Sequence, residues 1–144
     1  MQSAILIVQV LGTLVIAATL IVYFFQLRTM KEASNAQNIL AVVQFLQTKE
    51  VREARGTVRK ILKTKDVQTW TDIERDDAAT TCSSYDVAAI LAFNGLIDVN
   101  LLVEHWGPSI KECFEVCKPY IDEMRSMSGP IYWDDFELLY EQIS

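Results

Sequence analysis

The feature that most constrains this chain is an apolar run near its N-terminus, residues 4–25, which reads AILIVQVLGTLVIAATLIVYFF. Gln9 is its most polar residue, and the run contains no charge. Because a helix rises about 1.5 Å per residue, the run would be about 33 Å long, close to the roughly 30 Å hydrocarbon core of a bilayer. Tyr23, Phe24 and Phe25 lie where an aromatic belt would meet the membrane interface. The run therefore predicts a membrane-spanning helix.

A cleaved signal peptide is the main alternative for such a run. Signal peptides carry a charged segment, then an apolar stretch of about 7–15 residues, then a small-residue cleavage site. Here no charge precedes the run, the run is longer, and residues 23–26 (Tyr-Phe-Phe-Gln) form a poor cleavage context. We therefore expect an uncleaved anchor.

The charges that flank the run predict its orientation. No Lys or Arg precedes it, whereas Arg28 and Lys31 follow it closely. Basic residues favour the cytoplasmic side of a span, so we expect a single-pass protein of the inner (plasma) membrane, with its N-terminus outside and its C-terminal domain cytoplasmic. Three cysteines, an odd number without framework spacing, agree with a reducing compartment.

Charge is distributed unevenly after the span. Residues 28–65 carry a net charge of +6, and residues 66–144 carry −12. The two halves can attract each other within one domain, and a basic stretch near a bilayer can attract anionic headgroups. The acidity of the second half argues against nucleic acid as a partner.

The remaining sequence has the apolar spacing of helices and no sustained alternation typical of strands. We expect an all-α protein, with one N-terminal transmembrane helix followed by a small cytoplasmic helical bundle. The expected divisions are an anchor over residues 1–27, a juxtamembrane helix over 28–47 and a helical domain over 48–144. No Gly or Pro occurs between Thr13 and Arg55, so the anchor either continues as one long helix or breaks near residues 34–35.

Local signals place several helix ends in the second half. Thr71 and Glu74 have the spacing of a capping box, and the helix they open is expected to end near Gly95. A short helix is expected to stop at Gly107, with Pro108 in the first turn of the next. Pro119 should kink or split that helix.

One candidate for binding or ion pairing is a basic row at helical spacing: Arg52, Arg55, Arg59 and Lys63. Lipid headgroups, nucleic acid or an acidic partner would suit it. The competing interpretation is pairing with the acidic half of the domain. Asp86 lies among apolar residues and needs compensation if it is partly buried, so we expect it to contact Arg52, Arg55 or Arg59.

Residues that carry chemistry are sparse. Cys113 and Cys117 share an apolar stripe and suit core packing better than zinc, for which Cys82 and His105 would be the only further Cys or His ligands. Adjacent carboxylates at 76–77 and 134–135 suit helix N-termini rather than acid–base catalysis. We expect no catalytic, cofactor or metal site; an enzyme using Asp86, Glu137 or His105 is a lesser hypothesis.

The order of these features resembles a bacterial family, the domain of unknown function 4760 family, over about residues 45–140. The segments that carry the resemblance are Arg52-x-x-Arg55, Trp70-Thr71, Asp86, Leu101-Leu102-Val103-Glu104-x-Trp106-Gly107, Tyr120, Arg125 and Tyr132-Trp133-x-x-Phe136-Glu137-x-Leu139. Cys113 stands where a larger residue is expected. The resemblance implies short proteins with one N-terminal span and a helical domain, and no established activity. The aromatic residues Trp70, Trp106, Trp133 and Phe136 are expected in the core or on a binding surface.

These features favour a membrane-tethered, non-enzymatic interaction module, an accessory subunit of a larger membrane assembly being one form of it. The alternative is a membrane-associated stress or phage-defence effector. The expected partners are the lipid bilayer and either another membrane protein or a second copy of the chain.

Overall fold

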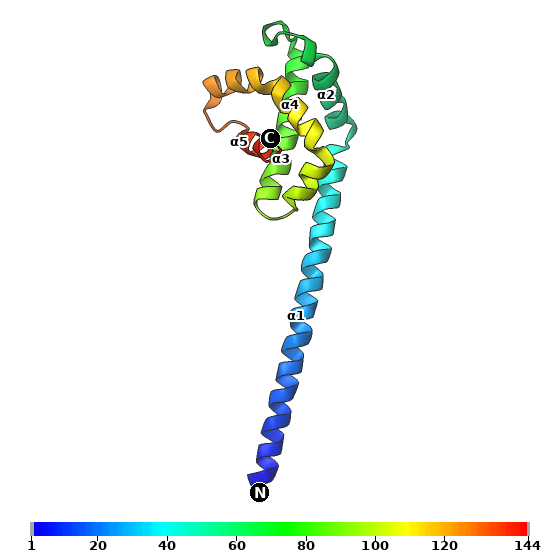
Figure 1. Ribbon diagram of the computed structural model, residues 1–144, viewed down its shortest axis with the longest axis vertical. Coiled ribbons are helices and arrows are strands. Elements are labelled where there is room, and N and C mark those ends of the chain that lie inside the picture. The colour runs from blue at the N-terminus through cyan, green and yellow to red at the C-terminus, as the bar shows by residue number, and fades with distance from the viewer. Residues whose placement is uncertain (1, 144) are drawn as a thin grey trace. The chain divides into compact units, whose positions relative to one another are not determined.

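The structure, a computed structural model, describes the backbone of residues 2–143 and the side chains of residues 14–143 (Figure 1). Its elements are α1 (Gln2–Leu46), α2 (Lys49–Lys60), the 3₁₀ turns η1 (Leu62–Thr64) and η2 (Val67–Thr69), α3 (Asp72–Phe93), α4 (Val99–Ser128) and α5 (Asp134–Glu141). Residues 2–143 contain no strand, so the predicted all-α fold is confirmed. The chain divides into two compact units, Met1–Gln37 and Asn38–Ser144.

The first unit is the larger part of α1, an unbroken helix that passes Ser34 and Asn35 without interruption. From residue 14 to residue 27 its apolar side chains are exposed. They are Leu14, Val15, Ile16, Leu20, Ile21, Val22, Tyr23, Phe24, Phe25 and Leu27. Side chains of residues 4–13, the first part of the predicted span, lie outside the described residues. By length and composition, Leu14–Leu46 meets the requirement for crossing a membrane, which a signal sequence or a core helix also meets.

The second unit begins inside α1. Val42 and Leu46 are buried in the core of the helical bundle, whereas Leu40 and Phe45 on the same stretch remain exposed. The helix ends at Leu46, and Thr48 precedes α2 in an extended conformation. The segment from Asn38 to Leu46 therefore packs as part of the bundle.

Helix α3 begins and ends where local signals predict. The Thr71 hydroxyl accepts a hydrogen bond from the Glu74 amide, and the Glu74 carboxylate accepts one from the Thr71 amide, which together form the capping box. At the other end Gly95 has a φ of +71°, and the Leu96 amide donates to the Leu91 carbonyl. A glycine takes this left-handed conformation without strain, which ends the helix.

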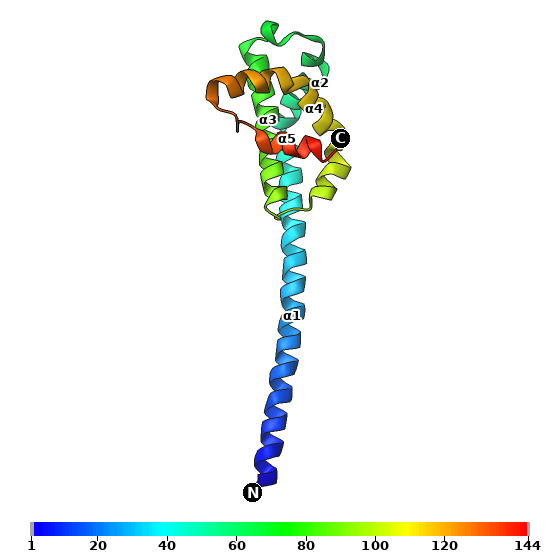
Figure 2. The ribbon, with the colours of Figure 1, turned by 60° about the vertical axis from the view of Figure 1, so that its left-hand side comes forward.

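Helix α4 differs from the prediction of two helices. It runs from Val99 to Ser128 through Gly107, Pro108 and Pro119, although it changes direction along its length in both ribbon views (Figures 1 and 2). A proline removes one amide donor but need not end a helix when packing holds the turns on both sides. Gly107 is buried, and a Cβ placed there would lie 3.9 Å from Ile143, so this turn is held against the C-terminal segment.

Helix α3 is the centre of the bundle and contacts α2, α4 and α5. Its inward face is built mostly from small residues, with Cys82, Ala88 and Ala89 fully buried around the larger Tyr85. Small side chains allow neighbouring helices to approach closely, and the aromatic residues of α4 and α5 fill the remaining space. The Tyr85 ring stacks on Phe136 of α5 at 5.4 Å between centroids.

Candidate functional site

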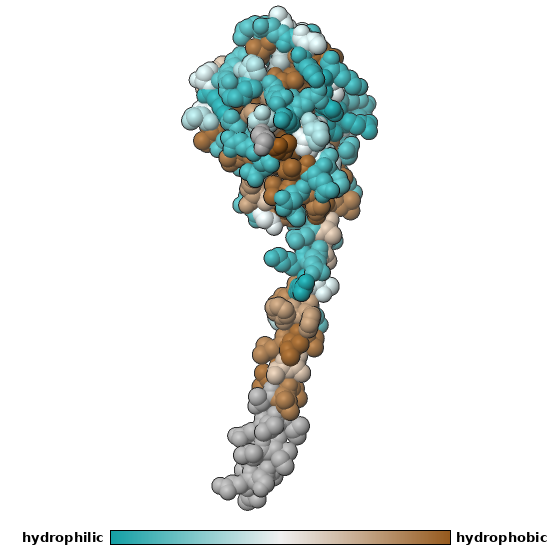
Figure 3. Space-filling view, in the orientation of Figure 1, coloured by the Kyte–Doolittle hydropathy of each residue, from teal (hydrophilic) through white to brown (hydrophobic). Residues whose placement is uncertain are grey.

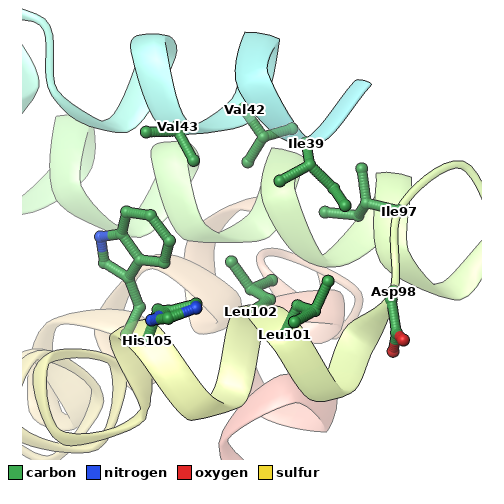
Figure 4. Close-up of a pocket in the computed structure, with 9 residues that line it drawn as sticks. Ile39, Val42, Val43, Ile97, Asp98, Leu101, Leu102 and His105 are labelled. Atoms are coloured by element: carbon green, nitrogen blue, oxygen red, sulfur yellow. The ribbon is translucent and has the colours of Figure 1, made fainter. Parts of the chain in front are cut away.

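An apolar hollow lies between the last turns of α1 and the first turns of α4 (Figure 4). It has a volume of about 330 Å³ and is lined by Ile39, Val42, Val43, Ile97, Asp98, Leu101, Leu102, His105 and Trp106. In the close-up, Ile39 and Val42 face Leu102 across the hollow, and the Asp98 carboxylate points away from it. Asp98 instead caps α4 by accepting a hydrogen bond from the Asn100 amide at 2.8 Å. The lining therefore suits an apolar group.

A second, smaller hollow of about 180 Å³ shares Val42 and Ile97 with the first. Exposed apolar side chains surround it on α1, α3 and the α3–α4 turn. They are Phe45, Val87 and Leu96, which line the hollow and are exposed. Asn38 fixes this region by donating to the Leu96 carbonyl at 3.0 Å. In Figure 3, apolar residues reach the surface of the helical unit between hydrophilic ones.

The basic row on α2 and η1 is partly neutralised by the acidic half of the domain. Glu112 of α4 accepts from Arg59 at 2.5 Å and from Lys63 at 2.8 Å. The bonds from Lys63 and Arg59 lower the pKa of Glu112, and the bond to Glu112 raises that of Arg59. The predicted type of pairing between the halves is present, but its acid is Glu112.

The expected contact of Asp86 with Arg52, Arg55 or Arg59 is wrong. Asp86 forms no ion pair with these residues, and its Oδ1 atom accepts a hydrogen bond from the Phe136 amide at 2.9 Å. Helix α5 needs this acceptor because its N-cap residue, Trp133, has a left-handed φ of 54° and offers no side-chain cap. An aspartate from α3 thus caps a helix that begins nearly fifty residues later. The spacing of residues within α3 does not predict this contact.

The segment before α5 is held by Arg125, a residue of the family pattern to which the sequence assigned no role. Its guanidinium donates to the carbonyl oxygens of Tyr132 at 2.9 Å and Trp133 at 3.3 Å, and to Glu137 at 2.5 Å. The Trp133 indole donates to the Ser83 hydroxyl at 3.1 Å. The closing aromatic segment of the pattern therefore has a structural role.

The four aromatic candidates fall into two groups. Trp70, Trp133 and Phe136 are buried, and Tyr120 lies between the two tryptophans with ring centroids 5.8 Å and 5.9 Å away. Trp106 is partly exposed and lines the apolar hollow beside His105. Of these four aromatic residues, Trp106 is the one available to a binding partner.

The cysteines are fully buried. Burial is the main cause that raises the pKa of Cys113 to about 12 and that of Cys82 well above its usual range, so both thiols stay protonated. Their environment fits core packing.

His105 is exposed at the apolar hollow, and its ring lies 6.1 Å from that of Trp106.

Three carboxylates meet at the start of α5. One oxygen from each of Asp86, Asp134 and Asp135 lies within 4.8 Å of the others. The positive end of the α5 dipole and the bond from Phe136 to Asp86 account for this grouping. Asp76 and Asp77 lie near the start of α3.

The fold and these sites define a class: a small helical bundle that carries a long apolar N-terminal helix and presents an apolar hollow and a partly neutralised basic row. Residues 13–143 match the family described as Domain of unknown function (DUF4760), and the chain belongs to that family. The family description assigns no enzymatic activity. No curated protein and no solved structure matches the chain significantly.

Proposed function

We propose that this chain is a membrane-tethered, non-enzymatic interaction module, anchored by α1 and acting through its helical unit as an accessory subunit of a membrane protein assembly. The observation that carries the anchoring is the exposed apolar surface of residues 14–27. Burying a large apolar side chain stabilises by about 1.5–3 kcal/mol. Moving the ten exposed side chains of this stretch from water into a bilayer would therefore be favourable by up to roughly 15–30 kcal/mol. That equals or exceeds the net stability of about 5–15 kcal/mol of a typical domain.

The polar groups in this part of α1 are compatible with a lipid environment. The Thr19 hydroxyl donates to the Val15 carbonyl at 2.8 Å, and the Thr29 hydroxyl to the Phe25 carbonyl at 3.0 Å. Each hydroxyl is therefore satisfied within the helix, as a membrane interior requires. Charge resumes at Arg28, which pairs with Glu32 at 3.2 Å. The basic residues after the span favour a cytoplasmic helical unit.

The apolar hollow beside Trp106 supports the interaction part of the proposal. Its volume of about 330 Å³ is at the lower end of ligand pockets, and its open apolar lining suits one or two large side chains of a partner helix. A partner anchored in the same membrane is favoured because tethering raises the effective concentration of both proteins. Bulky apolar and aromatic residues in pockets commonly dominate such interfaces.

The anchoring is tested by extraction of the full chain from membranes. We expect it to resist alkaline carbonate and to dissolve in detergent, and a C-terminal reporter to be active on the cytoplasmic side. Replacing Ile16, Leu20 and Phe24 with lysine should release the protein or prevent its insertion. Recovery of the unaltered protein in the soluble fraction would contradict the proposal.

The partner is tested by mild detergent purification with quantitative mass spectrometry. We expect one membrane protein at fixed stoichiometry, lost on Leu101→Glu in the hollow. Ile73→Glu is the matched control, because Ile73 is 76% exposed and does not line the hollow. Equal recovery of the same proteins with both variants would exclude the hollow as the binding site.

A further inference from the structure

A basic cavity of about 350 Å³ lies between α2 and α4 and is separate from the apolar hollow. Its lining consists of four cations, one glycine and one carboxylate: Arg52, Arg55, Arg59, Lys60, Gly56 and Glu112. The five α2 residues are spaced at i, i+3, i+4, i+7 and i+8, so they share one face of that helix. This concentrates positive charge around a single cavity that is open to solvent.

Arg55 is the most buried residue of the lining, only 8% exposed. Its Nη1 atom is buried and has no hydrogen-bond partner, and the residue forms no ion pair among the described residues. A guanidinium cannot escape burial by losing its proton, so an uncompensated buried arginine is costly. Arg55 also lies beside the Tyr85 hydroxyl. Burial raises the pKa of that hydroxyl, an effect that Arg55 and the bond to Ser109 oppose.

The one carboxylate of the lining does not compensate Arg55. Glu112 is held by Arg59 at 2.5 Å and by Lys63 at 2.8 Å, a cation outside the lining. Arg52, Arg55 and Lys60 are left without an ion pair among the described residues. The cavity therefore retains an excess of positive charge that an anion would balance.

Gly56 is unexplained by packing. Glycine inside a helix is less stable than alanine by roughly 0.5–1 kcal/mol, yet a Cβ at this position would meet no atom within 4 Å. Neither a neighbouring side chain nor a positive φ requires a glycine at this position. Its effect is to keep the helix surface bare where it faces the cavity.

We propose that this cavity binds a phosphate group, with Arg55 as the buried anchor and Arg52 and Lys60 at the opening. Arginine presents a planar fork of donors that matches phosphate oxygens, and the lining supplies three arginines. The volume accommodates one phosphate or a diphosphate. The group could belong to a soluble phosphate compound or to a phospholipid headgroup, and both would make the same contacts.

The test uses the purified full chain in uncharged detergent, titrated with inorganic phosphate and with pyrophosphate at constant ionic strength. We expect saturable binding by calorimetry and a rise in melting temperature. Arg52→Gln and Lys60→Gln should each weaken binding about tenfold, since a charged hydrogen bond is lost. Lys49→Gln is the matched control: it removes one charge from the same helix, at an exposed position outside the lining.

The lipid source is tested in parallel by native mass spectrometry of protein reconstituted with phosphatidylcholine and phosphatidic acid. Retention of phosphatidic acid that is lost in Arg52→Gln and kept in Lys49→Gln, without binding of free phosphate, assigns the site to a headgroup. Arg55→Met should abolish either response without lowering the melting temperature of the unliganded protein. If neither probe distinguishes Arg52→Gln and Lys60→Gln from Lys49→Gln, the proposal is overturned, whether or not Arg55→Met folds.

Discussion

The carboxylate of Asp86 accepts a hydrogen bond from the backbone amide of Phe136 at 2.9 Å and so caps α5 from α3. The same two helices are joined by the stacking of Tyr85 on Phe136. One contact satisfies a free amide and the other buries apolar surface, and together they fix where α5 begins. The polar contact is the easier of the two to test by substitution.

Removal of the Asp86 carboxylate should destabilise the helical unit. Asp86→Ala leaves the Phe136 amide without its acceptor, which typically costs about 1–2 kcal/mol. Asp86→Asn keeps an acceptor oxygen and should cost less. Urea unfolding of the full chain in detergent measures both, with exposed Asp76→Ala on the same helix as the control. Equal unfolding free energies for Asp86→Ala and Asp76→Ala would show that the cap contributes nothing.

The charge of Asp86 should make stability depend on pH. Burial raises the pKa of Asp86; the bond from Phe136 opposes this, and the charges of Asp135 and Asp134 add to it. The folded state then holds the proton more tightly than the unfolded state, so the contribution of Asp86 falls as pH rises from its unfolded value of roughly 3.9 through its folded value. As pH rises across that interval, the stability of Asp86→Asn relative to wild type should increase. A difference that stays constant with pH would refute this assignment.

The two glycines of α2 and the α3–α4 turn should respond oppositely to alanine. Gly56→Ala should stabilise the unit by about 0.5–1 kcal/mol, because the added Cβ meets nothing and helix propensity improves. Gly95→Ala should destabilise it, because the φ of +71° strains any residue with a Cβ. Thermal melting of both variants provides the comparison. Loss of stability in Gly56→Ala would mean that α2 needs the glycine for the fold itself.

The sequence predicted features that depend on neighbours along the chain. The capping box at Thr71 and the end of α3 at Gly95 follow from residues within one turn, and they are found as predicted. The continuity of α4 through Pro108 was missed, because tertiary packing outweighs a local signal to stop. The burial of Arg55 and the partner of Asp86 were missed for a related reason. Both depend on which helices become neighbours, and one sequence does not specify that.

Substitution of Arg125 should lower the stability of the helical unit more than substitution of an exposed lysine does. It bonds the carbonyl oxygens of Tyr132 and Trp133 and the Glu137 carboxylate, and its side chain is only 16% exposed. Arg125→Lys cannot reproduce this three-way fork and should lower stability by about 2 kcal/mol or more. Lys118→Ala, which removes a more exposed pair with Asp122, should cost less than about 1 kcal/mol. Chemical unfolding compares them directly, and a cost for Arg125→Lys no larger than for Lys118→Ala would contradict the clamp.

The three cysteines should report global unfolding. All are buried, and burial raises the pKa of Cys113 to about 12, so thiolate is scarce near pH 8 and reagents cannot reach the sulfur. Labelling with a disulfide reagent should therefore proceed at the rate of opening of the bundle and should accelerate in urea. Gln68→Cys, at an exposed position, provides the control, because its added thiol should react within seconds while the native three remain protected. Rapid labelling of a native cysteine at neutral pH would instead reveal local opening of α3 or α4, the helices that carry them, and would weaken the interpretation of this cluster as inert core.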